Sequence, residues 1–211
     1  MRTMASGVFM ADQLLYMTKK SVPTENIHAA FWHSFSNDAQ AMFSIQTTRK
    51  QGLAYKGKST DEGYGYRMPI YWVFKLLSEK RGELLVESRL RGNNTIDAPK
   101  SGLYFDPEYK FSRVSHCASR SGHKLYLALL NKDARQPVAV QISIQDWRLK
   151  TAVEIYEVRA DSYLAENTIK SPNTVTLAGP KVDRVDNSGR MTYQLKPNTL
   201  AVLRFQSDGR E

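Results

Sequence analysis

The stretch Leu125–Ile144, LYLALLNKDARQPVAVQISI, decides the fold predicted for this chain. An apolar run ends at Asn131, and a charged turn containing a proline follows it. Residues 138–144 then alternate between large apolar residues and small or polar ones. Alternation with a period of two is typical of a strand with one buried face. The stretch therefore predicts two strands joined by a turn.

The same period of two continues toward the C-terminus. Val153 and Ile155 alternate with their neighbours, and residues 200–205 alternate so that one face is largely apolar. Turn-forming residues at 171–173 and 186–189 separate these segments. Several short strands at this spacing indicate an antiparallel β-sandwich, here jelly-roll-like, over residues 83–211.

The first 82 residues follow a different pattern. Apolar residues at helical spacing predict helices over 8–20 and 69–80, with Gly82 as the cap that ends the second one. Residues 26–35 are apolar at odd and even positions alike, which predicts a strand that is buried on two sides. A polar loop follows this strand. Helix, strand, loop and helix are too little for a barrel of eight βα units, which takes about 200 residues. We therefore expect an α+β chain in which residues 1–82 are the last βα unit or units of an incomplete TIM-type barrel and residues 83–211 are a β-sandwich.

Three phrases of the sequence carry a resemblance to a known family. They are the strand ending in Asn131 with its charged turn, Glu166–Thr168 with Pro172–Val175, and Leu195–Phe205. In this order they resemble the C-terminal β-sandwich of the α-L-arabinofuranosidases of glycoside hydrolase family 51. The segment Tyr66–Trp72, followed by a helix and Gly82, is similar to the joint between the last barrel helix and that sandwich.

The resemblance implies where the chemistry takes place. A retaining glycosidase needs two carboxyl groups about 5 Å apart, one as nucleophile and one as acid/base. In the family both are Glu residues on earlier barrel strands, upstream of the part that this chain matches. Asp38, Asp61 and Glu62 are more typical of a solvated loop than of a catalytic pair. We therefore expect no catalytic residues in this chain, and no activity of the chain alone.

Sugar contacts are the one site that the sequence predicts. Trp32 and His33 lie at the end of the proposed barrel strand, and Tyr66 and Arg67 follow in the next loop. Aromatic faces and polar groups at this end of a barrel suit a sugar subsite. The alternative is that Trp32 and His33 pack between strand and helix. Met68 stands where family members often carry a Gln that reaches the sugar, and Met cannot donate such hydrogen bonds.

Composition excludes several other classes of function. The net charge is +9, but the basic residues are scattered rather than gathered in a stripe, which argues against a nucleic-acid binder. The four histidines and the single Cys117 lack metal-ligand spacing, so we expect no metal and no cofactor. Asp12 and Gln13 interrupt the N-terminal apolar stretch, so we expect neither a signal peptide nor a membrane span. The compartment and the oligomeric state stay open.

Three functions remain, and the resemblance orders them. The first is the C-terminal part of an α-L-arabinofuranosidase-like retaining hydrolase, which would act on arabinose-containing plant polysaccharides and belong to L-arabinose metabolism. The second is a stand-alone carbohydrate-binding β-sandwich, and the third is a basic nucleic-acid binder. The second predicts an aromatic platform on the sheet, drawn from Tyr104, Phe105, Tyr109, Tyr126, Tyr156, Tyr163 and Tyr193.

Overall fold

A computed structural model describes residues 3–20, 36–37, 43–45, 65–97, 110–168 and 170–209. The strand predicted at 26–35 lies outside these ranges. In chain order the elements are α1 (Met4–Lys20), β1 (Ser36–Asn37), β2 (Phe43–Ile45), β3 (Gly65–Arg67), α2 (Pro69–Glu79), β4 (Leu84–Val86), β5 (Thr95–Asp97), β6 (Lys110–Ser112), β7 (Val114–Ser121), β8 (Lys124–Asn131), β9 (Val138–Ser143), β10 (Ala152–Arg159), β11 (Thr176–Arg184), β12 (Arg190–Leu195) and β13 (Thr199–Gln206).

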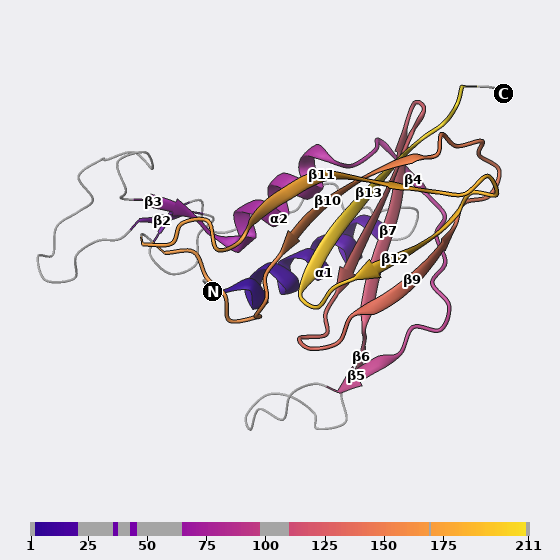
Figure 1. Cartoon of the computed structure of the whole chain (residues 1–211). Helices are drawn as coiled ribbons and strands as arrows, with labels where there is room; N and C mark the ends of the chain where they lie inside the picture. Colours follow the sequence, from indigo (N-terminus) through magenta and orange to yellow (C-terminus); the bar gives the residue numbers. More distant parts are fainter. Residues whose placement is uncertain are drawn as a thin grey trace, which may run out of the picture.

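The main sheet of the molecule has six strands in the order β11-β10-β13-β8-β7-β4, and all neighbours are antiparallel. The antiparallel pair β9 and β12 forms a second sheet across from it (Figure 1). The β-sandwich predicted from the alternating pattern is confirmed. The short strands β1, β2 and β3 form a separate small sheet, and β5 pairs with β6.

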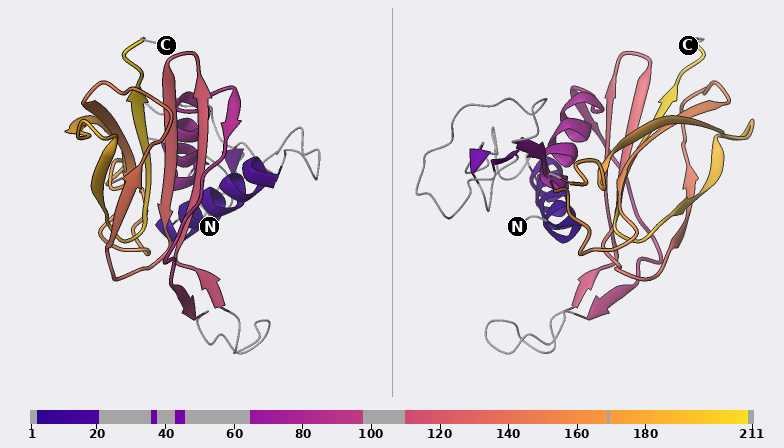
Figure 2. Two further views of the ribbon diagram at one scale, coloured as in Figure 1. Left: turned by 90° about the vertical axis from the view of Figure 1, so that its right-hand side faces the viewer. Right: turned by 60° about the vertical axis from the view of Figure 1, so that its left-hand side comes forward.

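Two apolar cores lie on opposite faces of the six-stranded sheet. On one face α1 and α2 cover the sheet, and on the other face β9 and β12 do (Figure 2). The first core joins residues of both helices to Tyr126, Leu130 and Val158 of the sheet. The second core lies between the two sheets and includes Leu129 and Phe205. The structure therefore has three layers: the helices, the six-stranded sheet, and the sheet of β9 and β12. The sandwich is made of the last two layers.

The central strands β8 and β13 are buried on both faces. This explains why the run Leu125–Leu130 is apolar at odd and even positions alike. In β8, Leu125 and Leu129 face the second sheet, while Ala128 and Leu130 face the helices. Strands buried on both faces lose the polar half of the alternation. By contrast β9 and β12 have one exposed face, and they keep a regular alternation of buried and exposed residues.

Helix α1 begins at Met4, four residues before the predicted start at residue 8. The backbone N–H groups of Met4 and Ala5 donate to the carbonyl oxygens of Ala165 and Tyr163, both at 2.8 Å. The first N–H groups of a helix have no partner within the helix, so a distant loop completes this end. Sequence periodicity could not predict the longer helix, because its partners lie about 160 residues away along the chain.

Gly82 does not cap α2, contrary to the prediction. The helix ends at Glu79, and the residue that caps it is Lys80, whose N–H donates to the Leu76 carbonyl oxygen. Gly82 instead lies against the backbone of β7, where a Cβ atom would stand 2.2 Å from the carbonyl carbon of Arg120. Its own N–H donates to the Ser119 hydroxyl at 2.9 Å. The glycine is required because two backbones approach each other closely here.

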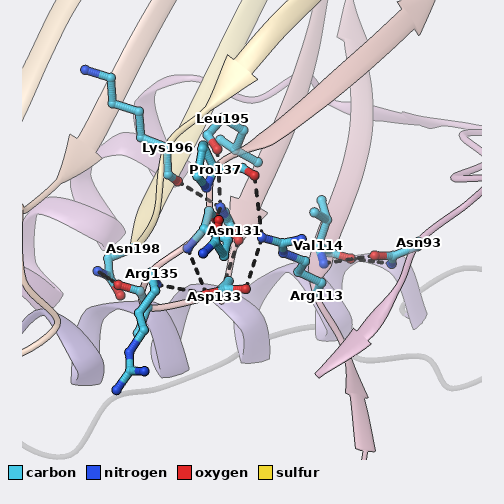
Figure 3. A network of polar contacts seen from close by, with 12 residues as sticks. Asn93, Arg113, Val114, Asn131, Asp133, Arg135, Pro137, Leu195, Lys196 and Asn198 are labelled. Atoms are coloured by element: carbon cyan, nitrogen blue, oxygen red, sulfur yellow. Dashed lines mark hydrogen bonds and ion pairs between the residues drawn. The ribbon is translucent and has the colours of Figure 1, made fainter. Parts of the chain in front are cut away.

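Asn131 ties the first phrase of the sequence to the third. Its side chain is fully buried, and its amide nitrogen lies 2.9 to 3.2 Å from the carbonyl oxygens of Gln136, Leu195 and Lys196 (Figure 3). Its amide oxygen accepts the N–H of Asp133 at 3.0 Å. The turn after β8 and the segment before β13 are therefore held together by one side chain.

Asn167 does the same for the second phrase. It is fully buried, and it pairs with Val175 through both a donated bond of 2.8 Å and an accepted bond of 2.7 Å. Its amide nitrogen also donates to the Arg67 carbonyl oxygen at 2.6 Å. The second phrase thus connects the sandwich to the segment directly before α2.

Helix α1 is further fixed to the sheet by Asp12. Both carboxylate oxygens lie 3.1 Å from Lys132 Nζ, and one of them accepts the Ser115 hydroxyl.

No helix within the described ranges is long and apolar enough to cross a membrane. The boundary near residue 83 stays a prediction, and the helices on the N-terminal side of it share a core with the strands on the other side.

Candidate functional site

Two of the four predicted sugar-contact residues lie within the described part of the chain. Tyr66 and Arg67 end strand β3, immediately before α2, while Trp32 and His33 fall outside the described residues. Tyr66 is only 4% exposed, whereas Arg67 is exposed. Their sugar-contact role stays a prediction, and the geometry favours Arg67 over Tyr66 as the group available to a ligand.

The guanidinium of Arg67 lies on two aromatic rings of the first turn of α2. Its Cζ is 5.3 Å from the ring centroid of Tyr71 and 5.4 Å from that of Trp72. The two rings meet edge to face, with centroids 5.0 Å apart. Cation–π contacts of this kind orient a guanidinium while leaving its N–H donors free to bind.

Trp72 adds a feature that the sequence did not predict. Its ring is partly buried and packs against the core between the helices and the sheet. Its indole Nε1, however, is buried without a hydrogen-bond partner. The only sequence signal for this cluster is an Arg followed four and five residues later by two aromatic residues, a spacing that brings them together once α2 forms. Met68 is fully buried before α2, so its side chain faces the protein interior.

The carboxylates that are partly or fully buried in the described ranges serve structural pairs. Asp12 pairs with Lys132, Asp133 with Arg113, Glu154 with Arg204 and Glu157 with Lys181. Each acid faces a base rather than a second acid. Two adjacent carboxyl groups of the kind that retaining glycosidases use are not among these pairs.

Asp133 shows how such pairing acts on an acid. Burial opposes its charge, but the N–H groups of Arg135 and Gln136 and the nearby Arg113 outweigh burial (Figure 3). Together they hold the pKa of Asp133 below its usual range. The group stays ionised and stabilises its turn.

Glu157 is the most buried of these acids, with a side chain 6% exposed. It accepts the Tyr193 hydroxyl at 2.7 Å from the facing sheet and Lys181 Nζ at 2.9 Å from β11. Burial raises the pKa of Glu157, but the bonds from Lys181 and Tyr193 outweigh burial and lower it overall. The same burial and the bond to Glu157 raise the pKa of Tyr193. The cluster joins the two sheets.

We expect the Glu157→Gln variant to change acid stability. The folded-state pKa of Glu157 is below its usual value of 4.5, so its charge stabilises the fold above that value. This contribution is lost as pH falls through the folded-state pKa. The variant should therefore lose about 1 to 3 kcal/mol at neutral pH and show a shallower decline in acid. Urea unfolding at several pH values measures the free energy of unfolding, with the exposed Glu83→Gln variant as control. An equal decline of that free energy with falling pH in the parent protein and both variants would contradict the prediction.

Metal and thiol chemistry find no support in the described residues. No group of three potential metal ligands occurs among them. Cys117 is buried in β7, and burial raises the pKa of its thiol, although the nearby Lys19 acts in the opposite direction. Burial lowers the pKa of His116, because burial disfavours the charged form of the ring.

The aromatic platform expected of a carbohydrate-binding sandwich is not formed by the described tyrosines. Tyr126, Tyr156 and Tyr193 are buried, and burial together with the bond to Glu154 raises the pKa of Tyr156 to about 12. Tyr163 alone of these four is exposed, at 46%. Tyr104, Phe105 and Tyr109 lie outside the described residues.

Comparison with known families decides the classification. A model of the α-L-arabinofuranosidase C-terminal domain matches residues 39–199, which is more than half of the chain. The chain belongs to the family of α-L-arabinofuranosidase C-terminal domains. The match runs from before β2 to the start of β13, so it includes α2 as well as most of the sandwich. No match was found among curated proteins.

Solved structures agree with the fold of an α-L-arabinofuranosidase C-terminal domain. The chain is similar to the α-L-arabinofuranosidase of Thermotoga maritima in its arabinose complex, with 22% identity and a TM-score of 0.71 over 97% of the chain. It is similar to the family 51 enzyme of Thermotoga petrophila RKU-1, with 23% identity, a TM-score of 0.70 and 96% of the chain covered. The family 51 enzyme from Xanthomonas axonopodis pv. citri gives 17% identity and a TM-score of 0.68 over 97% of the chain.

The chain spans little more than a third of these enzymes. It covers 38% of the Thermotoga maritima chain, 38% of the Thermotoga petrophila chain and 36% of the Xanthomonas chain. At identities under 25% the likeness establishes the fold and not the substrate.

Proposed function

We propose that this chain supplies the end of the catalytic barrel and the C-terminal β-sandwich of an α-L-arabinofuranosidase-like retaining glycoside hydrolase. The substrate of the whole enzyme would be an arabinose-containing plant polysaccharide or oligosaccharide. Both catalytic Glu residues would come from the part of the enzyme that corresponds to the remaining length of the relatives. The chain alone would then be inactive.

One observation carries the proposal. The structural likeness extends across both helices as well as the sandwich, and the family match includes α2, while the chain covers only 36 to 38% of the enzymes named above. The described acids add support, because the buried ones are engaged by bases. The sandwich would act by holding α1 and α2, through the shared core, in the position that a barrel requires.

The sugar-contact residues fit this proposal as one edge of a larger site. Arg67 would be the most available of these contacts, since it is exposed and its guanidinium lies on Tyr71 and Trp72. Its backbone is held by Asn167 of the sandwich. In this proposal the sandwich positions a sugar contact without touching the sugar itself.

Purified protein tests the proposal in a simple assay. We expect the 211-residue chain to release no 4-nitrophenol from 4-nitrophenyl α-L-arabinofuranoside above the rate in buffer, because both carboxyl groups for retaining hydrolysis would lie in another segment of the enzyme. A circular dichroism spectrum rich in β-structure, recorded on the same sample, shows that the protein is folded. Turnover that copurifies with the folded chain would overturn the assignment of catalysis to another segment.

A further inference from the structure

A groove opens between the two sheets on the side of the sandwich away from the helices. Its volume is about 840 Å³. Small-ligand sites in proteins are typically about 300 to 1,000 Å³, so the groove has the size of a binding site. Leu127 of β8 and Val140 of β9 line its depth, and Trp147, which follows β9, lines its mouth.

The opposite rim of the groove is a strap, residues 87–92, that follows β4. The strap is anchored at two points. His116 Nε2 lies 3.1 Å from the Ser88 carbonyl oxygen, and Asn93 pairs with Val114 through bonds of 2.8 and 3.1 Å. Because both ends are fixed to β7, the strap residues between them are held in place before any ligand arrives.

The lining of the groove combines an apolar surface with hydrogen-bonding side chains. Trp147 is partly buried and packs against the core between the sheets, so its ring is fixed. Arg91 and Gln145 are exposed and lie on opposite rims. Planar amide and guanidinium groups beside an aromatic ring and aliphatic side chains suit a ligand with hydroxyl groups around an apolar ring face.

Charge further restricts the ligand. Glu87 and Arg89 on the strap are ion-paired at 2.8 Å. The remaining charges of the lining are those of Arg91 and Asp146, which are opposite in sign, and burial lowers the pKa of His116, so that its ring is neutral near pH 7. Lys19 Nζ of α1 lies 3.1 Å from His116 Nε2 but is not part of the lining. The charges of the groove's own lining sum to zero, although the chain as a whole carries +9. Its lining is complementary to a neutral ligand rather than to an anion.

We propose that this groove is an oligosaccharide-binding site on the sandwich, taking a short neutral pentose chain. The choice of pentose rests on the proposed function. Arg67, Tyr71 and Trp72 are not among the residues that line the groove, so this site is separate from the Arg67 cluster. The sandwich would then hold a second portion of a polysaccharide whose cleavage takes place elsewhere in the enzyme.

Titration of the ¹⁵N-labelled chain with arabinotriose tests the proposal. The chain has three tryptophans, so its indole N–H signals are few, and the Trp147→Phe variant assigns that of Trp147. We expect saturable shifts of the Trp147 signal, with maltotriose producing much weaker ones. Saturable shifts confined to the other indole signals would overturn binding in the groove while supporting a sugar site elsewhere in the chain. Absence of saturable shifts at the solubility limit, or equal response to maltotriose, would also overturn it.

Variants of exposed rim residues keep the test independent of folding. Arg91→Ala and Gln145→Ala should each weaken arabinotriose binding, about tenfold for Arg91 because a hydrogen bond from a charged group is lost. Arg135→Ala, on the turn after β8, is the matched control and should bind as the parent does. Unchanged affinity in both rim variants, or equal weakening in the control, would overturn the proposal.

Discussion

Replacing Gly82 by Ala is expected to destabilise the protein by about 3 kcal/mol or more. The new Cβ would stand 2.2 Å from the carbonyl carbon of Arg120, 2.3 Å from its oxygen and 2.5 Å from its nitrogen. These are backbone atoms of a strand in the middle of a hydrogen-bonded ladder, so they cannot move aside as a flexible side chain would. The segment leaving α2 would be pushed off β7, and the bond from the Gly82 N–H to Ser119 would be lost.

Gly92→Ala is the matched control for that substitution. Gly92 has a φ of +65°, and a Cβ there would meet nothing within 4 Å. Its cost should be limited to the left-handed backbone, about 1 kcal/mol. Urea unfolding followed by circular dichroism measures both. Equal losses of stability in the two variants would contradict the close approach of α2's exit segment to β7.

Replacing Asn131 by Ala is expected to cost about 3 kcal/mol or more. The substitution removes the bonds to the carbonyl oxygens of Gln136, Leu195 and Lys196 and leaves the Asp133 N–H without its acceptor. The site is fully buried, so water does not replace the lost amide without entering the core. The turn after β8 and the segment that enters β13 should then move apart from each other.

Asn187→Ala, an exposed residue of the turn before β12, is the control for Asn131. It should change the free energy of unfolding by less than about 0.5 kcal/mol. Exchange of amide protons should also become faster at the facing ends of β8 and β13 in the Asn131 variant. Retention of full stability in that variant would contradict the role of Asn131 as the link between the first and third phrases.

The period of two predicted the sandwich, and the helical stripes predicted α1 and α2 close to their observed ends. Local patterns report which face of an element is buried, and that information is sufficient for these elements. The layer order could not be predicted from the same patterns. Burial of β8 and β13 on both faces depends on the helices packing on the far side of the sheet, and no local pattern specifies which elements meet.

The candidate sites were less predictable than the fold. Arg67 was recognised as a polar residue after a barrel strand, but its aromatic support by Tyr71 and Trp72 depends on the start of α2. Gly82 was interpreted as a helix cap because glycine after a helix is usually one, whereas a close approach of β7 requires it here. The groove beside Trp147 is formed by three separate segments within residues 86–91, 116–129 and 140–147 and has no local signal.

Helices α1 and α2 share a core with the sandwich, and we claim that they fold with it as one unit. The core between helices and sheet includes Ile70, Val73 and Leu76 of α2 on one side and Leu130 and Val202 on the other. The Asp12–Lys132 pair and the Asn167–Arg67 bond connect the same parts. Removing the helices would expose this face of the sheet to water.

Urea unfolding of the full chain and of residues 83–211 alone tests the claim most directly. We expect one cooperative transition for the full chain, coincident by tryptophan fluorescence and by circular dichroism. The shorter protein should show no cooperative transition and should aggregate or bind a hydrophobic dye, because its helix-facing core is uncovered. A soluble 83–211 fragment that unfolds cooperatively at the midpoint of the full chain would contradict the claim.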